Sequence, residues 1–210
     1  AGVSLALSGG LTRALLQAAD LHEIRETRVQ MGTVVTVTVV HPDTSMARQM
    51  VASAFVEMER LEGLLSRHRA GTSVTRLNAD GVVHDAPTEL LYLVEEAVNY
   101  SRLTVGAFDI TVKPLLDLYA SSFARTGISP QDSQVQEVLS YVGYRDILVD
   151  GSSVAFKRKR MSITLDGIAK GYIVDRAVGS LRENGAQQVL VDAGGDMGSV
   201  GGRSQSEGWR

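Results

Sequence analysis

The sequence predicts an α+β protein in which a mixed, largely antiparallel β-sheet is packed with helices. β-branched runs that alternate in character indicate half-buried strands. Apolar residues at helical spacing indicate amphipathic helices between those strands. The dipeptide Asp150-Gly151 separates two strand-like runs and is typical of a tight hairpin turn between antiparallel strands. A purely parallel, doubly wound sheet is therefore not expected.

The first half of the chain contains a strand followed by helices. Residues 29–40 (VQMGTVVTVTVV) alternate Val with Thr, which predicts a strand with one buried face. Residues 44–65 carry apolar side chains at helical spacing, and Asp43-Thr44 can supply the cap of that helix. The polar run at 66–78 is expected to be a loop. A second helix is expected at 87–103, since Pro87 suits a first turn.

The second half alternates strands and helices. Ser129-Pro130-Gln131-Asp132 predicts a helix start, with Ser as the cap and Pro in the first turn. The other elements expected here are strands at 144–149, 153–159, 161–165 and 188–193, and a helix at 168–184 closed by Gly185.

The composition excludes several classes of protein. The 210 residues include 21 Lys plus Arg and 24 Asp plus Glu, so the net charge is −3. A strongly basic nucleic-acid binder is therefore not expected. The chain has no cysteine, which excludes disulfides, thiolate metal sites, a cysteine nucleophile and a lipidated lipobox cysteine within it. Hydrophobic residues make up 44%, which is typical of a globular domain.

The first 19 residues, AGVSLALSGGLTRALLQAA, differ in composition from the rest. They are small and apolar with one charge, and a charged run, DLHEIRETR, follows. This pattern is typical of the end of a secretory signal. We expect residues 1–19 to be the remnant of an export signal and residues 20–210 to be the folded domain, in the periplasm or at the outer face of the cytoplasmic membrane. An ordinary N-terminal helix is the alternative.

Familiar catalytic motifs are absent from the sequence. It contains no GxxxxGK[ST], GxGxxG, HExxH or GxSxG pattern. Its four histidines are scattered, which argues against a histidine-based zinc site.

Small residues and a carboxylate coincide in three segments, at 106–111, 165–172 and 192–196. Small residues let the backbone approach a ligand, and a helix N-terminus favours phosphate. Carboxylates nearby suit Mg²⁺, so the segments together predict a magnesium-dependent site for a phosphate-bearing ligand. Each segment alone also fits a structural role: a turn that buries Phe108, a helix cap with a solvated Lys170, and a turn before a new strand.

From about residue 28 to residue 210 the chain resembles the FAD:protein FMN transferases, the ApbE flavin transferase family. Several long motifs in one order argue against chance similarity. They are MGT at 31–33, SRHRAGTSVTRLN at 66–78, GAFDITVKPLLDLY at 106–119, VGY at 142–144, LDGIAKGYIVDRA at 165–177 and LVDAGGDM at 190–197.

The resemblance implies a set of site residues. The residues that it implies contact the flavin or the rest of FAD are Met31, His68, Ala107, Phe108, Asp109, Asp166, Lys170, Tyr172, Gly194, Gly195 and Asp196. The backbone carbonyl of Ala169 matches a magnesium ligand, and no catalytic residue is assigned. His68 stands where the family often has Tyr, and Asp166 where other members carry a small residue. Lys113 replaces a commoner Gly.

The implied activity is Mg²⁺-dependent transfer of FMN from FAD to a Thr or Ser hydroxyl of a target protein, with release of AMP. The implied partners are subunits of Na⁺-translocating NADH:quinone reductase or Rnf-type complexes that carry a D-x-x-[ST]-G-A-T motif. A Mg²⁺-dependent FAD pyrophosphatase and a non-catalytic FAD-binding protein remain as alternatives.

The resemblance also implies that the C-terminal part of the family domain is missing from this chain. That part carries an Asp and a Thr that complete the magnesium site.

Overall fold

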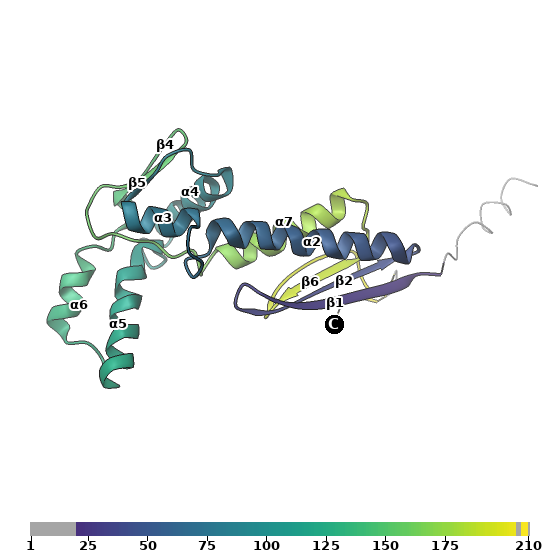
Figure 1. Cartoon of the computed structure of the whole chain (residues 1–210), viewed down its shortest axis with the longest axis horizontal. Coiled ribbons are helices and arrows are strands. Elements are labelled where there is room, and N and C mark those ends of the chain that lie inside the picture. The colour runs from purple at the N-terminus through teal and green to yellow at the C-terminus, as the bar shows by residue number, and fades with distance from the viewer. Residues whose placement is uncertain (1–19, 205–206, 210) are drawn as a thin grey trace, which may run out of the picture.

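The structure is a computed structural model that describes residues 20–204 and 207–209, so the expected export signal at 1–19 lies outside it. Within these residues, α-helices pack against two antiparallel sheets with the strand orders β1-β2-β6-β7 and β3-β5-β4 (Figure 1). The predicted α+β class with largely antiparallel pairing is confirmed. No helix of the described part is both long and apolar enough to cross a lipid bilayer.

A β-hairpin forms one edge of the four-stranded sheet. The strands of this sheet are β1 (His22–Gln30), β2 (Thr33–His41), β6 (Val189–Ala193) and β7 (Asp196–Val200). The single strand predicted at 29–40 is wrong, because β1 ends at Gln30 and β2 begins at Thr33. Met31 and Gly32 both adopt positive φ, 53° and 70°, which is the backbone of a tight hairpin turn. The strand predicted at 188–193 is confirmed as β6.

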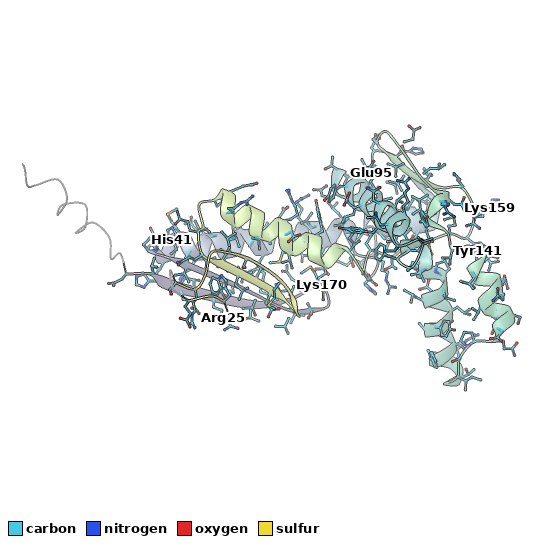
Figure 2. The ribbon with its side chains drawn as sticks, turned by 180° about the vertical axis from the view of Figure 1, so that it is seen from behind. Arg25, His41, Glu95, Tyr141, Lys159 and Lys170 are labelled. Atoms are coloured by element: carbon cyan, nitrogen blue, oxygen red, sulfur yellow. The ribbon has the colours of Figure 1, made fainter. Side chains whose placement is uncertain are left out.

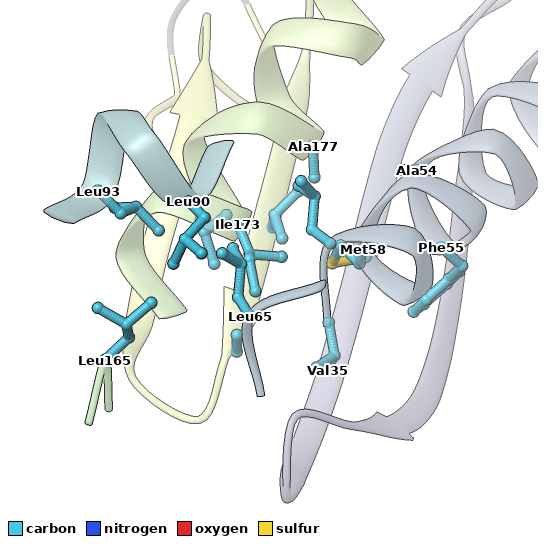
Figure 3. Close-up of a cluster of buried hydrophobic side chains, with 14 of the residues drawn as sticks. Val35, Ala54, Phe55, Met58, Leu65, Leu90, Leu93, Leu165, Ile173 and Ala177 are labelled. Atoms are coloured by element: carbon cyan, nitrogen blue, oxygen red, sulfur yellow. The ribbon is translucent and has the colours of Figure 1, made fainter. Parts of the chain in front are cut away.

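Two long helices, α2 (Thr44–Leu65) and α7 (Ala169–Glu183), cover one face of that sheet. Asp43 caps α2 as predicted, since its Oδ1 accepts hydrogen bonds from the backbone of Ser45 and Met46 at 2.7 and 3.0 Å. The helix predicted at 168–184 is confirmed within one residue at each end. Between helices and sheet lies an apolar core, shown in part in Figure 3. Its members include Val35, Ala54, Phe55, Met58, Leu65, Ile173 and Ala177.

The three-stranded sheet lies beside a second group of helices. The elements are α3 (Ser73–Asp80), β3 (Val82–Val83), α4 (Thr88–Leu103), β4 (Ile147–Asp150) and β5 (Ser153–Phe156). The predicted helix at 87–103 is confirmed, as is the hairpin across Asp150-Gly151, with shorter strands than expected. The loop predicted at 66–78 is wrong from Ser73 onward. Thr72 Oγ1 accepts from Thr75 N and caps the short, polar helix α3.

A pair of helices, α5 (Lys113–Thr126) and α6 (Asp132–Leu139), projects from the body of the molecule (Figure 1). The start of α6 corrects a prediction, because Gln131 is the cap in place of Ser129. Gln131 and Gln134 exchange side-chain and backbone hydrogen bonds in a capping box, so Pro130 precedes the helix.

The strand predicted at 161–165 does not form. Asn78 of α3 donates from Nδ2 to the Ile163 carbonyl at 2.9 Å and accepts from the Ile163 N–H at 2.7 Å. Thr164 N donates to the Ile110 carbonyl at 2.8 Å. The extended segment is therefore bound by a side chain and a turn instead of a neighbouring strand.

Candidate functional site

Two hollows meet at the start of α7. The first has a volume of about 480 Å³ and lies between the β1–β2 turn, the end of α2 and the first turn of α7. It is lined by Met31, Gly32, Glu62, Leu65, Ser66, His68, Leu165, Asp166, Ala169, Lys170 and Ile173.

The second hollow, of about 520 Å³, lies between α4, the turn that follows it and the same end of α7. Its lining residues are Tyr100, Thr104, Phe108, Asp166, Gly167, Ile168, Lys170, Gly171, Tyr172, Asp175 and Asp196. Asp166 and Lys170 thus line both hollows. Figure 2 shows Lys170 at the end of α7, where the four-stranded sheet meets the rest of the molecule.

An ion pair joins two of the predicted segments at this point. Lys170 Nζ lies 2.8 Å from Asp196 Oδ2, and both side chains are partly exposed. Asp196 opens β7 directly after Gly194 and Gly195, which have φ values of 64° and 98°. A Cβ on Gly194 would lie 2.2 Å from Thr33 Oγ1, so this turn packs tightly against β2. The two glycines line neither hollow, so the FAD contacts expected of them stay predictions; their turn leads directly to Asp196.

A second ionic contact holds Asp166, at the wall that separates the hollows. Its Oδ2 accepts from Arg67 Nε at 2.6 Å, and His68 Nε2 lies 3.8 Å from the same oxygen. His68 and Asp166 are two of the three positions where the chain departs from the family pattern, and the structure places them side by side. Arg67 lies within the 66–78 motif, but the resemblance assigns it no role, so the sequence did not indicate this contact.

The β1–β2 turn is fixed over the first hollow by an acidic side chain of α2. Met31 N donates to Glu62 Oε2 at 3.1 Å, and Arg69 lies 3.7 Å from that oxygen. This contact holds Met31 in its left-handed backbone, where a non-glycine residue is uncommon. Glu62 was not predicted from the sequence, since its only signal there is its place one turn before the end of a predicted helix.

The turn after α4 is organised by Asp109. One oxygen of its carboxylate accepts from Thr111 N and Thr111 Oγ1 at 2.8 and 2.6 Å, and the other accepts from Tyr144 N at 2.9 Å. The side chain lines neither hollow, and neither does Ala107. Asp109 therefore holds the shape of the turn, and the FAD contacts expected of these two residues stay predictions.

Aromatic side chains form much of the second hollow. Phe108 meets Tyr100 edge to face, with ring centroids 6.3 Å apart, and a Cβ on Gly167 would lie 3.3 Å from its ring. The segment at 106–111 thus contacts the segment at 165–172. Tyr172 lies 5.6 Å from Tyr92, ring to ring, and burial raises the pKa of its hydroxyl above the usual value.

The described residues offer an incomplete set of magnesium ligands. They contain no cluster of three His, Asp or Glu side chains that could hold a metal ion. Mg²⁺ needs six oxygen ligands in octahedral geometry and commonly takes several from substrate phosphates and water. The carboxylates that line the hollows are partly engaged, Asp166 by Arg67, Asp196 by Lys170 and Glu62 by Met31 N. These residues fit an ion carried mainly by a ligand's phosphates, and they do not form a cage of their own.

Comparison with known proteins identifies relatives over most of the chain. The sequence profile of the ApbE family matches residues 31–210. A FAD:protein FMN transferase from Vibrio cholerae serotype O1 is 26% identical over 73% of this chain and 47% of its own length. One from Salmonella typhimurium is 25% identical over 86% of this chain and 53% of its own length. The chain spans about half the length of the curated relatives it matches.

Solved structures share the fold. The flavin transferase ApbE from Vibrio cholerae has a TM-score of 0.80 at 23% identity and covers 90% of this chain and 63% of its own. The ApbE protein from Thermotoga maritima has a TM-score of 0.75 at 27% identity and covers 88% of this chain and 60% of its own.

Proposed function

The chain belongs to the ApbE family, and on that premise we propose that it transfers FMN from FAD to a Thr or Ser hydroxyl of a target protein and releases AMP. The observation that carries the proposal is the meeting of two hollows at Asp166 and Lys170. FAD has two ring systems joined by a pyrophosphate, so a two-part site with a cation at its junction matches its chemistry.

The junction suits a pyrophosphate for two reasons. Lys170 Nζ is paired there with a partly exposed carboxylate, that of Asp196, which a phosphate oxygen can replace. In addition, α7 begins with no side-chain cap. Ala169 N donates to the Leu165 carbonyl at 2.7 Å, and the next residues of the first turn lie at the positive end of the helix dipole.

The transfer is a displacement at phosphorus. The acceptor hydroxyl oxygen bonds to the phosphorus of the FMN half and loses its proton to a base. The bridging oxygen leaves with AMP. Lys170 would offset charge that builds on the phosphate oxygens. Magnesium, when bound, would supply the same kind of charge stabilisation, with the Ala169 carbonyl as one ligand and phosphate oxygens as others.

The proposed acceptor is a flavin-carrying subunit of a membrane redox complex, either Na⁺-translocating NADH:quinone reductase or an Rnf-type complex. Its hydroxyl would lie in a D-x-x-[ST]-G-A-T motif. The reaction would take place in the periplasm or at the outer face of the cytoplasmic membrane. Both proposals extend the family resemblance and the composition of residues 1–19.

The test is to incubate the whole protein and the 210-residue chain in parallel with FAD, Mg²⁺ and an acceptor domain that carries the motif. The intact mass of the acceptor and the free AMP are then measured. A gain of one FMN per acceptor with equimolar AMP is expected from the whole protein. If AMP forms without a mass gain of the acceptor, the protein is instead an FAD pyrophosphatase. If neither AMP nor a mass gain is detected, it is an FAD-binding protein without this activity.

A further inference from the structure

The loop that follows α2 contains three consecutive basic side chains, Arg67, His68 and Arg69. The two arginines bind different parts of the fold. Arg69 pairs with α2 itself, where its Nη2 lies 2.6 Å from Glu59 Oε1. Arg67 reaches the segment before α7 and donates from Nε to Asp166 Oδ2 at 2.6 Å, across 99 residues of sequence. The loop is therefore held on both sides of His68, by different elements.

The bond between Arg67 and Asp166 connects two walls of the first hollow. Ser66 and His68 line this hollow after the end of α2, and Asp166 lines it just before α7. Arg67 lies between Ser66 and His68 in the chain but lines neither hollow. Any effect of Arg67 on a bound ligand must therefore be transmitted through the residues that it holds.

This ion pair is better shielded from solvent than the other arginine ion pairs in the described part of the chain. The Arg67 side chain is 22% exposed, whereas every other arginine that forms an ion pair there exposes at least 41%. Shielding and a short, charge-assisted hydrogen bond make the contact stronger than a screened surface pair. Arg67 thus holds the carboxylate in one place, and His68 Nε2 lies 3.8 Å from the same oxygen.

We propose that Arg67 is a positioning residue of the first hollow, which acts through Asp166 and keeps Asp166 and His68 in place for the flavin half of FAD. This inference rests on the proposed function, which makes FAD the ligand. The first hollow suits the flavin half because apolar side chains such as Met31 and Ile173 line it, and isoalloxazine is the larger ring system of FAD. Loss of Arg67 would let the wall move and would weaken binding of this half only.

The test measures binding of FMN, by flavin fluorescence, and of AMP, by calorimetry, to Arg67→Gln in the whole protein. We expect the FMN dissociation constant to rise about tenfold, a usual size for coupling between residues in contact, and the AMP dissociation constant to change less than about twofold. In FMN transfer, the KM for FAD should rise while kcat at saturating FAD changes less than about twofold, because only binding is lost. Arg67→Lys keeps the charge and should recover part of the FMN affinity.

A double variant shows whether the effect passes through Asp166. In Asp166→Asn, the further change Arg67→Gln should weaken FMN binding less than about twofold, since Arg67 then has no carboxylate to hold. Arg160→Gln is the matched control, because Arg160 also pairs with a carboxylate, that of Glu137, and lines neither hollow.

Four results would overturn the proposal while FMN transfer stands. They are normal FMN affinity in Arg67→Gln, an equal loss of AMP affinity, a loss that multiplies with that of Asp166→Asn, and an equal loss of FMN affinity in the Arg160→Gln control. If the unaltered protein transfers no FMN, the proposed function fails, whereas the FMN and AMP titrations still decide the role of Arg67.

Discussion

Lys170 and Asp196 form an ion pair at 2.8 Å that connects the first turn of α7 to the first residue of β7. Their side chains are 34% and 46% exposed, so solvent screens the pair and it contributes little to stability. The main effect of the ion pair is to position Lys170, because it keeps the ammonium group at the place where the two hollows meet.

Replacement of Lys170 by Ala should weaken FAD binding about tenfold, the usual effect of losing a charge-assisted hydrogen bond to phosphate. Titration of flavin fluorescence would measure it. Lys113→Ala is the control, because Lys113 pairs with Asp117 on α5 and lines neither hollow. Equal FAD affinity in both variants would make Lys170 an ordinary solvated lysine.

Asp109→Ala should lower the free energy of unfolding by about 2 kcal/mol, since three hydrogen bonds are lost and Tyr144 N is left without its acceptor. FAD binding should weaken as well, because the same turn places Phe108 in the second hollow. Urea denaturation gives the first quantity, and Asp80→Ala, at an exposed end of α3, is the control. Equal stability of the two variants would contradict this role for Asp109.

Gly194 and Gly195 offer a matched pair of substitutions in one turn. Alanine at Gly195 meets nothing within 4 Å, so it should cost only the backbone strain, about 1 kcal/mol. Alanine at Gly194 adds a clash with Thr33 and should cost about 2 kcal/mol or more. Thermal denaturation of the two variants would compare them, and a greater loss from Gly195→Ala would refute the argument.

Acidification should weaken the ion pairs that Arg60 makes within α2, to Glu57, and across to Glu89 of α4. Arg60 bonds Glu57 at 2.8 Å and Glu89 at 2.7 Å. The hydrogen bond from Arg60 holds the pKa of Glu57 below its ordinary 4.5. A lowered carboxyl pKa stabilises the fold above the ordinary value, and this contribution is lost as the pH falls through the lowered one.

Arg60→Met should therefore destabilise the protein by about 1 kcal/mol at neutral pH and reduce the loss of stability below pH 4.5. Urea denaturation at several pH values would measure both effects. Arg48→Met, at an exposed position of the same helix, should leave the pH dependence unchanged. Parallel acid curves for Arg60→Met and the unaltered protein would contradict the expectation.

The long amphipathic helices could be predicted from the sequence, and the short polar elements could not. Residues 44–65 repeat their apolar pattern over many turns and end as expected. The β1 strand HEIRETRVQ is charged and lies at a sheet edge, so no apolar alternation marks it. Segment 161–165 has strand composition, but a side chain of α3 takes its hydrogen bonds. A tertiary contact of this kind, in which a distant side chain replaces a neighbouring strand, leaves no signal in the local sequence.

The candidate site was predictable where small residues and carboxylates gather in a motif. The three segments at 106–111, 165–172 and 192–196 do meet, through Phe108 with Gly167 and through Lys170 with Asp196. The residues that hold them in place were not predictable. Arg67 and Glu62 act across loops and helices, and only the folded arrangement reveals their partners.

The two hollows take their walls from two parts of the molecule, the β1–β2 turn and β7 from the four-stranded sheet and α4 with its following turn from the second group of helices. A ligand bound in both hollows would therefore contact, and hold together, parts of the chain that are far apart in sequence. Backbone amides at 104–109 and at 166–171 would exchange with solvent deuterium more slowly, and to a similar degree, once the ligand is bound. Amides in the projecting helices α5 and α6 would keep their exchange rates.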